Sequence, residues 1–453
     1  MIFNGKKVLV LGAARSGVSA AKVLKEAGAQ VTVNDTAEAD RLTADIAELA
    51  TEGISLISGS HPLSLLEDGY DLIVKNPGIP PSIPFLQEAR NKGITILSEI
   101  ELAYQVSRGR LIGITASNGK TTTTTWVTEM LKRDFPGVIM AGNIGIPLSW
   151  EAANCEQNTW LVVELSSFQL HDIDEFRCEI AAILNISPAH LDWHGSFESY
   201  MAAKENAIIN QTHHDTAVLN ADNEITREMA QRAKGRVLQF SRLDAVEKGA
   251  YIRNDEIWLR LENQETALLA CDDLGVAYGH NIENAMAASL VAVAAGARLE
   301  SIRDALRGFK GLAHRFQVVA ELKGRTFIND SKATNPGASE IALILPGKPI
   351  VLIAGGLERG IDLAGFAKQI ARYCRGVVLI GQTSQRLADD LRSIGFTNYH
   401  MAKDMAEAVP LSYSQSHEGD VILLSTGCAS WDMYSNYDVR GDDFIAQVHK
   451  LSR

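Results

Sequence analysis

The segment Leu111–Thr125, with the sequence LIGITASNGKTTTTT, constrains the fold more than any other part of the chain. An apolar stretch leads into a glycine turn, which Lys120 and Thr121 follow at the start of an expected helix. A helix N-terminus after a strand offers backbone N–H groups and a positive dipole end, while the lysine and threonine add a cation and a hydroxyl ligand for Mg²⁺. The segment therefore predicts a phosphate-binding loop.

The glycine spacing of this loop departs from the common P-loop pattern. Five residues separate Gly113 from Gly119, where the common pattern has four, and only the Gly119-Lys120-Thr121 half is strict. The alternative is a strand, turn and helix with an incidental lysine. Threonine runs favour strands, so such a run would be an unusual choice for a helix without a function.

Length and composition bound the remaining interpretation. A chain of 453 residues is too long for one hydrophobic core and indicates about three domains. With 46% apolar residues, 22% charged residues and a net charge of -12, we expect a globular protein that does not bind nucleic acid. Five cysteines without metal-type spacing indicate reduced thiols, and no apolar stretch reaches the ~18 residues of a membrane span. We therefore expect a cytoplasmic enzyme without a membrane span.

The first expected domain, residues 1–98, follows a strand and helix alternation. Apolar strands are predicted at Lys7–Gly12, Gln30–Asp35, Asp71–Asn76 and Ile94–Ile100, with plausible helices between them. Alternation of this kind is typical of a parallel sheet, and ligands bind such sheets at the carboxyl ends of the strands. We expect a Rossmann-like domain.

The glycines of this domain give only a weak cofactor signal. Gly12, Ser16 and Gly17 depart from the dinucleotide pattern G-x-G-x-x-G, which requires a glycine at Ala14. Asp35 is placed to accept bonds from a ribose, or equally to cap a helix. A nucleotide-dependent oxidoreductase remains a rival interpretation on this basis.

Two further domains complete the predicted α/β fold. In residues 99–310, the apolar runs Leu161–Leu165 and Ala181–Ser187 end in polar residues, which indicates central parallel strands beside the phosphate loop. Residues 311–453 carry apolar runs at 351–356, 377–382 and 421–427 that alternate with helical stretches. We expect three domains, each a mainly parallel sheet flanked by helices: an N-terminal Rossmann-like, a central P-loop ATPase-like and a C-terminal Rossmann-like domain.

Several polar residues follow the phosphate loop in an order that suggests chemistry. Glu164 ends a strand and is a natural Mg²⁺ ligand, and His190 is a candidate for a second metal or a phosphate. Lys204 lies on an amphipathic helix, where the default expectation is a solvated lysine. Asn284 either caps a helix or recognises the edge of a base. Arg315 lies in a polar cluster from which a second domain would bring an arginine to a γ-phosphate.

Taken together, these blocks resemble the Mur ligase family, the ATP-dependent amino-acid-adding enzymes of peptidoglycan precursor synthesis. The resemblance covers the whole length. Besides the phosphate loop and the helix with Lys204, it rests on GNIGIP (142–147), ELSSFQL (164–170), HLDWHGS (190–196), GHNIENAMAA (279–288), HRFQVV (314–319) and NDSKATNP (329–336). In the loop, Ala116 and Ser117 replace the more usual glycine and threonine.

Within the family the chain is most similar to the members that add D-glutamate to UDP-N-acetylmuramoyl-L-alanine. The N-terminal βαβ segment, the ELSSFQL block and the C-terminal stretch 423–444 support this, although Thr426-Gly427 stands where those members have Pro-Ala. Another Mur-type amino-acid ligase remains the alternative. A P-loop switch that hydrolyses ATP to move domains is a further rival.

The resemblance implies an acyl-phosphate mechanism that uses ATP and two Mg²⁺ ions. It implies catalytic roles for Lys120, His190 and Lys204, with Lys204 carrying a carbamate. The implied metal ligands are Thr121, Glu164, His190 and the Lys204 carbamate. The implied ATP-binding residues are Ala116, Ser117, Asn118, Gly119, Lys120, Thr121, Thr122, Asn284, Arg315 and Asp330.

The resemblance also divides the two other substrates between the outer domains. The muramoyl substrate is expected against Arg15, Ser16, Gly17, Asp35, Thr36, Asn76 and Asn143, of which Asn143 also contacts the triphosphate region. D-glutamate is expected against Lys332, Thr334, Arg359, Ser430, Trp431 and Tyr437. We expect a monomer whose domains close during catalysis.

Overall fold

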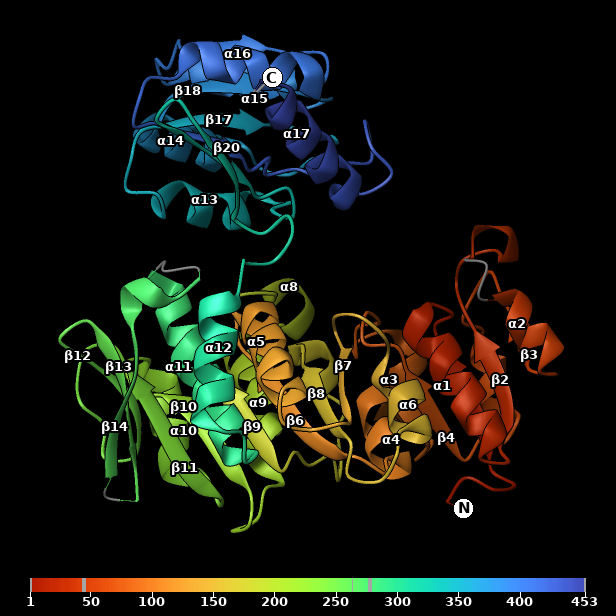
Figure 1. Ribbon diagram of the computed structural model, residues 1–453. Helices are drawn as coiled ribbons and strands as arrows, with labels where there is room; N and C mark the ends of the chain where they lie inside the picture. Colours follow the sequence, from red (N-terminus) through yellow and green to blue (C-terminus); the bar gives the residue numbers. More distant parts are fainter. Residues whose placement is uncertain (1, 43–45, 263, 276–278, 452–453) are drawn as a thin grey trace. The chain divides into compact units, whose positions relative to one another are not determined.

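The computed structural model describes residues 2–42, 46–262, 264–275 and 279–451, which form three separate sheets (Figure 1). The contacts divide the chain into two compact units, Met1–Phe309 and Lys310–Arg453. The first unit contains two sheets and the second contains one. The predicted class, three α/β domains with mainly parallel sheets, is confirmed, while the domain boundaries at residues 98 and 310 stay a prediction.

The N-terminal sheet is parallel throughout, with the strand order β3-β2-β1-β4-β5. Its strands are β1 (Lys7–Leu11), β2 (Gln30–Asn34), β3 (Ser55–Ile57), β4 (Leu72–Lys75) and β5 (Thr95–Ser98), and its helices are α1 (Arg15–Glu26), α2 (Ile46–Thr51) and α3 (Pro84–Asn91). The order reverses between β1 and β4, and open α/β sheets bind ligands at such a switch point.

Two glycines permit close packing at this switch point. Gly12 has a φ of +100°, and a Cβ there would lie 2.7 Å from the Cβ of Asn76. A Cβ on Gly17 would lie 1.8 Å from the carbonyl oxygen of Gly12. Both positions therefore require glycine, because helix α1 packs directly against the end of β1.

The central sheet follows the order β14-β13-β12-β11-β10-β9-β6-β8-β7. Its strands are β6 (Arg110–Thr115), β7 (Val138–Gly142), β8 (Trp160–Glu164), β9 (Ile180–Ile183), β10 (Thr216–Asn220), β11 (Arg236–Ser241), β12 (Gly249–Arg253), β13 (Glu256–Leu261) and β14 (Gln264–Ala270). The strands from β7 to β12 pair in parallel, whereas β12, β13 and β14 form antiparallel pairs that the sequence did not predict.

Helices cover both faces of the central sheet (Figure 1). They are α5 (Lys120–Lys132), α6 (Leu148–Asn154), α7 (Ser167–Leu170), α8 (Leu191–His194), α9 (Phe197–Ile209), α10 (Glu224–Arg232), α11 (Gly279–Ala294) and α12 (Leu299–Gly308). Helices α5, α11 and α12 pack together, and α4 (Glu99–Val106) packs on α6 and α1, which joins the N-terminal and central domains. The expected strand Ala181–Ser187 is wrong in extent, because β9 ends at Ile183.

The C-terminal unit has the strand order β15-β16-β20-β17-β18-β19, in which only the β15–β16 pair is antiparallel. Its strands are β15 (Gln317–Leu322), β16 (Arg325–Asn329), β17 (Ile350–Ala354), β18 (Cys374–Leu379), β19 (Tyr399–Met401) and β20 (Val421–Leu424). Its helices are α13 (Pro336–Ile344), α14 (Ala364–Tyr373), α15 (Ser384–Ser393), α16 (Met405–Gln415) and α17 (Tyr437–Leu451). Apolar clusters lie on both faces of this sheet.

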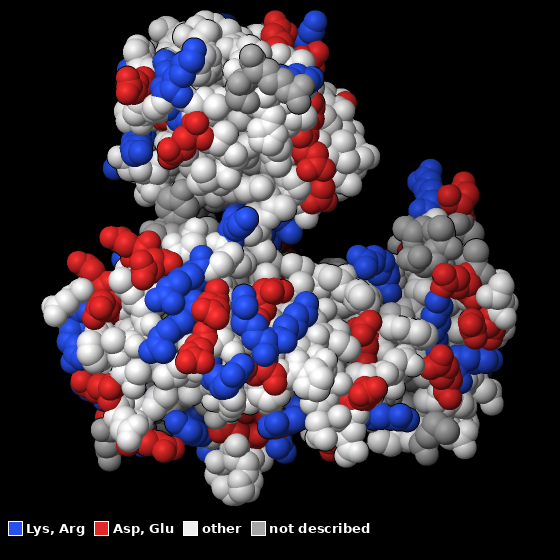
Figure 2. All heavy atoms as spheres, in the orientation of Figure 1, with Lys and Arg blue, Asp and Glu red and all other residues white. Residues whose placement is uncertain are grey.

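Acidic and basic side chains are interspersed over the face of the molecule shown in Figure 2. Among the residues that the structure describes, no helix is both long and apolar enough to cross a membrane. The five cysteines are all buried and unpaired, as their spacing predicts.

Candidate active site

The phosphate loop connects strand β6 to helix α5, as the sequence predicts. Gly119 is the N-cap of α5 and has a φ of +91°, a left-handed conformation that residues other than glycine rarely adopt. The cap provides no side-chain hydrogen bond to the first turn of α5. The first N–H groups of a helix have no partner within the helix, so this end is suited to bind an anion.

The loop is held by the chain that follows β9. The backbone N–H of Ser117 donates to the Asn185 carbonyl (2.9 Å), and the N–H of Asn118 donates to the Asn185 side-chain oxygen (2.9 Å). The Ser117 hydroxyl lies 2.9 Å from the Tyr200 hydroxyl. Ala116 is fully buried without a positive φ, so the turn does not require the usual glycine. Asn185 was not predicted from the sequence, where its signal is a polar residue inside an apolar run.

Two lysines converge on one carbonyl of this loop. The Lys120 Nζ donates to the Ala116 carbonyl at 2.8 Å, and the Lys204 Nζ donates to the same oxygen at 2.8 Å. Lys204 is 1% exposed, and burial together with the charge of Lys120 lowers its pKa well below the ordinary value. The default expectation of a solvated Lys204 is therefore wrong. A lower pKa increases the fraction of neutral amine, the form that reacts with CO₂.

Glu164 is a buried carboxylate of which only one oxygen accepts a hydrogen bond among the described residues. It lies at the end of β8, 2% exposed, and its Oε1 accepts a hydrogen bond from the Asn143 amide at 2.8 Å. Its Oε2 is buried and has no hydrogen-bond partner among the described residues. A buried carboxylate oxygen of this kind fits a Mg²⁺ ligand, since an unpaired charge is costly to bury.

The described side chains near Glu164 do not by themselves form a complete set of metal ligands. No group of three or more His, Cys, Asp or Glu residues that suits a metal occurs in the described ranges. Thr121, at the start of α5, is 3% exposed and offers a hydroxyl. Mg²⁺ commonly combines one or two carboxylates with substrate phosphates and waters, which is compatible with this sparse set.

His190 lies near Lys120 of the phosphate loop and Lys204 of helix α9. It is an exposed residue with a φ of +54°, and its ring packs 5.0 Å from the ring of Phe168. Desolvation, followed by the charges of Lys120 and Lys204, lowers its pKa, so the neutral imidazole is favoured. A neutral imidazole is the form that binds metals.

Asn284 lies against the phosphate loop rather than at a helix end. It is inside α11, beyond the first turn, so the helix-capping interpretation is wrong. A Cβ added to Gly119 would lie 2.3 Å from the Asn284 Oδ1, and the Asn284 amide donates to Asn281 at 3.3 Å. The position beside a nucleotide-binding loop is compatible with recognition of a base.

Most of the residues that are expected to bind the muramoyl substrate lie at the switch point of the N-terminal sheet. The Asp35 carboxylate accepts the N–H groups of Ala13 (2.7 Å) and Ala37 (2.8 Å), so it organises both loops. The Asn76 amide donates to the Ser16 hydroxyl at 2.9 Å. The Arg15 guanidinium donates to the carbonyl of residue 145 in the central domain, and Thr36 is exposed.

In the C-terminal unit, Asp330 is a half-buried carboxyl directly after the end of β16. Its Oδ2 accepts the Ser425 hydroxyl at 2.8 Å, and its Oδ1 accepts the Phe316 N–H at 3.1 Å. Burial raises the pKa of Asp330 to about 7, although these hydrogen bonds and the charge of Arg315 oppose the increase.

Five of the residues expected at glutamate lie on loops after parallel strands of this unit, and the sixth, Tyr437, begins helix α17. The Lys332 Nζ lies 5.0 Å from the centre of the Tyr437 ring, and the Arg359 guanidinium lies 5.7 Å from that of Trp431. Thr334 is half-buried and Ser430 is buried. The buried Arg440 was not predicted from the sequence; it donates to the carbonyls of Ser331 (2.7 Å) and Cys428 (3.0 Å) and so joins two of these loops.

Comparison with known proteins identifies the class that this fold and site define. Residues 6–98 match the Mur ligase MurD-like N-terminal domain, residues 114–292 the Mur ligase middle domain, and residues 314–428 the Mur ligase glutamate ligase domain. The chain belongs to the Mur ligase family, as the sequence motifs indicate.

Its relatives include two UDP-N-acetylmuramoylalanine–D-glutamate ligases. The protein from Ligilactobacillus salivarius (strain UCC118) is 44% identical over 99% of this chain and 97% of its own length. The protein from Clostridioides difficile (strain 630) is 40% identical over the full length of both chains. The fold is similar to that of MurF from Acinetobacter baumannii, with a TM-score of 0.60 at 18% identity over 97% of this chain and 93% of that one.

Proposed function

We propose that this chain is an ATP-dependent ligase that adds D-glutamate to UDP-N-acetylmuramoyl-L-alanine in peptidoglycan precursor synthesis. Full-length identity of 40–44% to ligases of that name supports the substrates. The observation that carries the chemistry is the phosphate loop, where Lys120 and Lys204 share the Ala116 carbonyl.

The reaction activates a carboxylate and then forms an amide. The alanyl carboxylate of the muramoyl substrate attacks the γ-phosphorus of ATP, which gives an acyl phosphate and ADP. The glutamate amine then attacks the acyl carbon, loses a proton, and expels phosphate through a tetrahedral intermediate. Lys120 and the N-terminus of α5 stabilise the charge that develops on the transferred phosphoryl group.

The metal site that we propose uses Thr121, Glu164, His190 and a carbamate on Lys204, with two Mg²⁺ ions. Bound Mg²⁺ would neutralise phosphate charge at this site. Support comes from the unpartnered Glu164 Oε2 and from the burial of Lys204. A carbamate would convert a buried cation into a hard oxygen ligand, because CO₂ joins the neutral amine with release of a proton.

The other substrate contacts that we propose follow the family resemblance. ATP is proposed against Ala116, Ser117, Asn118, Gly119, Lys120, Thr121, Thr122, Asn284, Arg315 and Asp330. The muramoyl substrate is proposed against Arg15, Ser16, Gly17, Asp35, Thr36, Asn76 and Asn143, and D-glutamate against Lys332, Thr334, Arg359, Ser430, Trp431 and Tyr437. We further propose that the enzyme acts in the cytoplasm as a monomer, with the five free thiols in support of a reducing compartment.

A coupled assay of phosphate release tests this proposal. The purified protein receives ATP, Mg²⁺ and UDP-N-acetylmuramoyl-L-alanine with D-glutamate, L-glutamate, L-lysine or D-alanine. We expect phosphate release only with D-glutamate. Preference for another amino acid would indicate a different Mur-type ligase. ATP hydrolysis without the muramoyl substrate would favour a P-loop switch, and tight NAD(P) binding would favour an oxidoreductase.

A further inference from the structure

Lys75 is a fully buried cation that the proposed mechanism does not use. It ends strand β4 in the N-terminal domain, and its side chain is 0% exposed. The Nζ lies 3.1 Å from the Asp172 Oδ2, which belongs to the central domain, and donates to the Ile79 carbonyl at 3.0 Å. It also lies 5.3 Å from the centre of the Trp193 ring. One ammonium group therefore contacts three segments of the chain.

On the N-terminal side, Lys75 closes the turn that contacts the proposed UDP site. The Ile79 N–H donates to the Asn76 carbonyl at 3.1 Å, which defines a turn, and Lys75 binds the carbonyl at the end of that turn. The Asn76 amide in the same turn donates to Ser16 at the start of α1. Lys75 thus fixes the turn that positions Asn76 and Ser16.

On the central side, the partners of Lys75 belong to the segments that carry Glu164 and His190. Asp172 follows helix α7, and its Oδ1 lies 3.1 Å from the His171 Nδ1 and 3.4 Å from an Arg90 nitrogen. Burial would raise the pKa of Asp172, but His171 and Lys75 lower it to about 2, so the group is anionic at neutral pH. Burial lowers the pKa of Lys75, and the charge of Asp172 opposes this decrease. Trp193 lies in α8, whose N-cap is His190.

We propose that Lys75 and Asp172 are positioning residues that hold the UDP-binding turn in register with the segment that carries His190. A buried ion pair adds little net stability, because desolvation offsets the Coulomb attraction. This pair does, however, join the end of β4 to the segment after α7 through a contact of 3.1 Å. The reaction needs the muramoyl carboxylate, held through the uridine diphosphate on one domain, to meet a phosphate held on the other. A displacement of about 1 Å in such an arrangement is able to reduce turnover about 100-fold.

This inference rests on the proposed function, and Lys75→Met tests it separately. The wild-type assay decides the function, whereas the ratio of variant to wild type decides the role of the pair. We expect kcat/KM for the muramoyl substrate to fall about tenfold or more. KM for ATP should stay within about twofold, because the phosphate loop keeps its own contacts with Asn185 and Tyr200.

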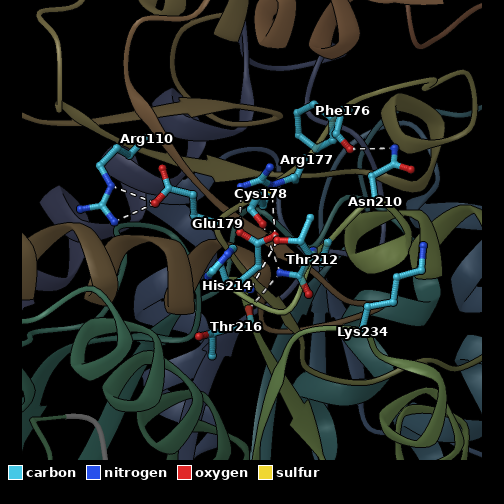
Figure 3. A network of polar contacts seen from close by, with 12 residues as sticks. Arg110, Phe176, Arg177, Cys178, Glu179, Asn210, Thr212, His214, Thr216 and Lys234 are labelled. Atoms are coloured by element: carbon cyan, nitrogen blue, oxygen red, sulfur yellow. Dashed lines mark hydrogen bonds and ion pairs between the residues drawn. The ribbon is translucent and has the colours of Figure 1, made fainter.

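The matched control is another ion pair with a buried carboxylate, at the opposite edge of the central sheet. Arg177 lies 3.0 Å from Asp215, which is 2% exposed, just before β9 and β10 begin. The Thr212 hydroxyl also donates to Asp215. Figure 3 shows Arg177 and Thr212 close to one another in this network, with the Arg110–Glu179 ion pair beside them. Arg177→Met should lower the melting temperature without a selective loss of kcat/KM for the muramoyl substrate.

Three kinetic results would overturn the proposal. The first is an unchanged kcat/KM for the muramoyl substrate in Lys75→Met. The second is a rise in KM for ATP as large as the fall in kcat/KM for the muramoyl substrate. The third is the same fall in kcat/KM for the muramoyl substrate in Arg177→Met. If Lys75→Met does not fold, the isosteric Asp172→Asn is judged by the same criteria. Failure of both variants to fold would also overturn it, because the pair would then be required for the fold itself.

Discussion

Ionisation of the half-buried Asp330 should weaken the C-terminal unit as pH rises. Its pKa is about 7 in the folded protein, because burial disfavours the carboxylate, and about 3.9 in an unfolded chain. Between these pH values the unfolded state releases the proton and the folded state retains it. The free energy of unfolding therefore falls as pH rises from about 4 to 7 and levels off above. The total loss is about 4 kcal/mol, of which about 2.5 kcal/mol falls between pH 5 and 8.

Asp330→Asn isolates this effect, because the amide does not titrate. The Asn amide would donate to the Ser425 hydroxyl, which lies 2.9 Å from the Ser339 hydroxyl and can donate to it instead. The amide oxygen would still accept the Phe316 N–H. We expect the variant to gain about 2.5 kcal/mol over the wild type between pH 5 and 8, since all other titrating groups are shared. It should lose activity if the carboxylate contacts nucleotide.

Hydrogen exchange under mild urea measures the stability of this unit without interference from the other. Peptides from β16 and β20 report the opening of the sheet that contains Asp330. Comparison of wild type and variant at the same pH cancels the strong pH dependence of the intrinsic exchange rate. A stability difference that stays constant from pH 5 to 8 would refute the reasoning, because it would mean that Asp330 has an ordinary pKa.

Three further predictions concern the first compact unit. Glu164→Gln should raise the Mg²⁺ concentration needed for half-maximal activity, because an amide is a poorer ligand than a carboxylate, and an unchanged titration would make Glu164 structural. Lys204→Ala should lose ligase activity that acetate partly restores, and full activity without acetate would exclude the role. Gly17→Ala should destabilise by about 3 kcal/mol or more in thermal unfolding, because its Cβ would meet the Gly12 carbonyl at 1.8 Å. Gly308→Ala, in the same compact unit, is the control and should be nearly neutral, because a Cβ there meets nothing within 4 Å.

The sequence predicts what depends on local geometry. Gly119 and the apolar run before it predict β6, the phosphate loop and α5, because a left-handed residue between a strand and a helix has few alternatives. The parallel strands that end at Asn34, Lys75 and Glu164 were predicted from buried apolar runs with polar ends. These signals extend over about ten residues, so neighbouring positions are sufficient to detect them.

The sequence does not predict which distant side chains meet. The burial of Lys204 depends on the end of β6, since its ammonium donates to Ala116 and approaches Thr115, and a helical pattern alone gives no sign of those partners. Lys75 and Asp172 likewise meet because two domains pack together. Strand order, rather than local pattern, determines such pairs, and family resemblance supplied the role of Lys204 where the pattern did not.

The carbonyl of Ala116 links the phosphate loop to the proposed carbamate. Because Lys120 and Lys204 each lie 2.8 Å from this oxygen, their nitrogens are no more than about 5.6 Å apart. Two positive charges at that separation would repel by about 3 kcal/mol at an effective dielectric constant of about 20, and this repulsion adds to burial in lowering the pKa of Lys204. A carbamate on Lys204 would replace this repulsion by attraction, and a phosphate oxygen would bind Lys120 more strongly than a neutral carbonyl does. The side chain at position 116 has no part in these steps, which explains why alanine is able to replace glycine there.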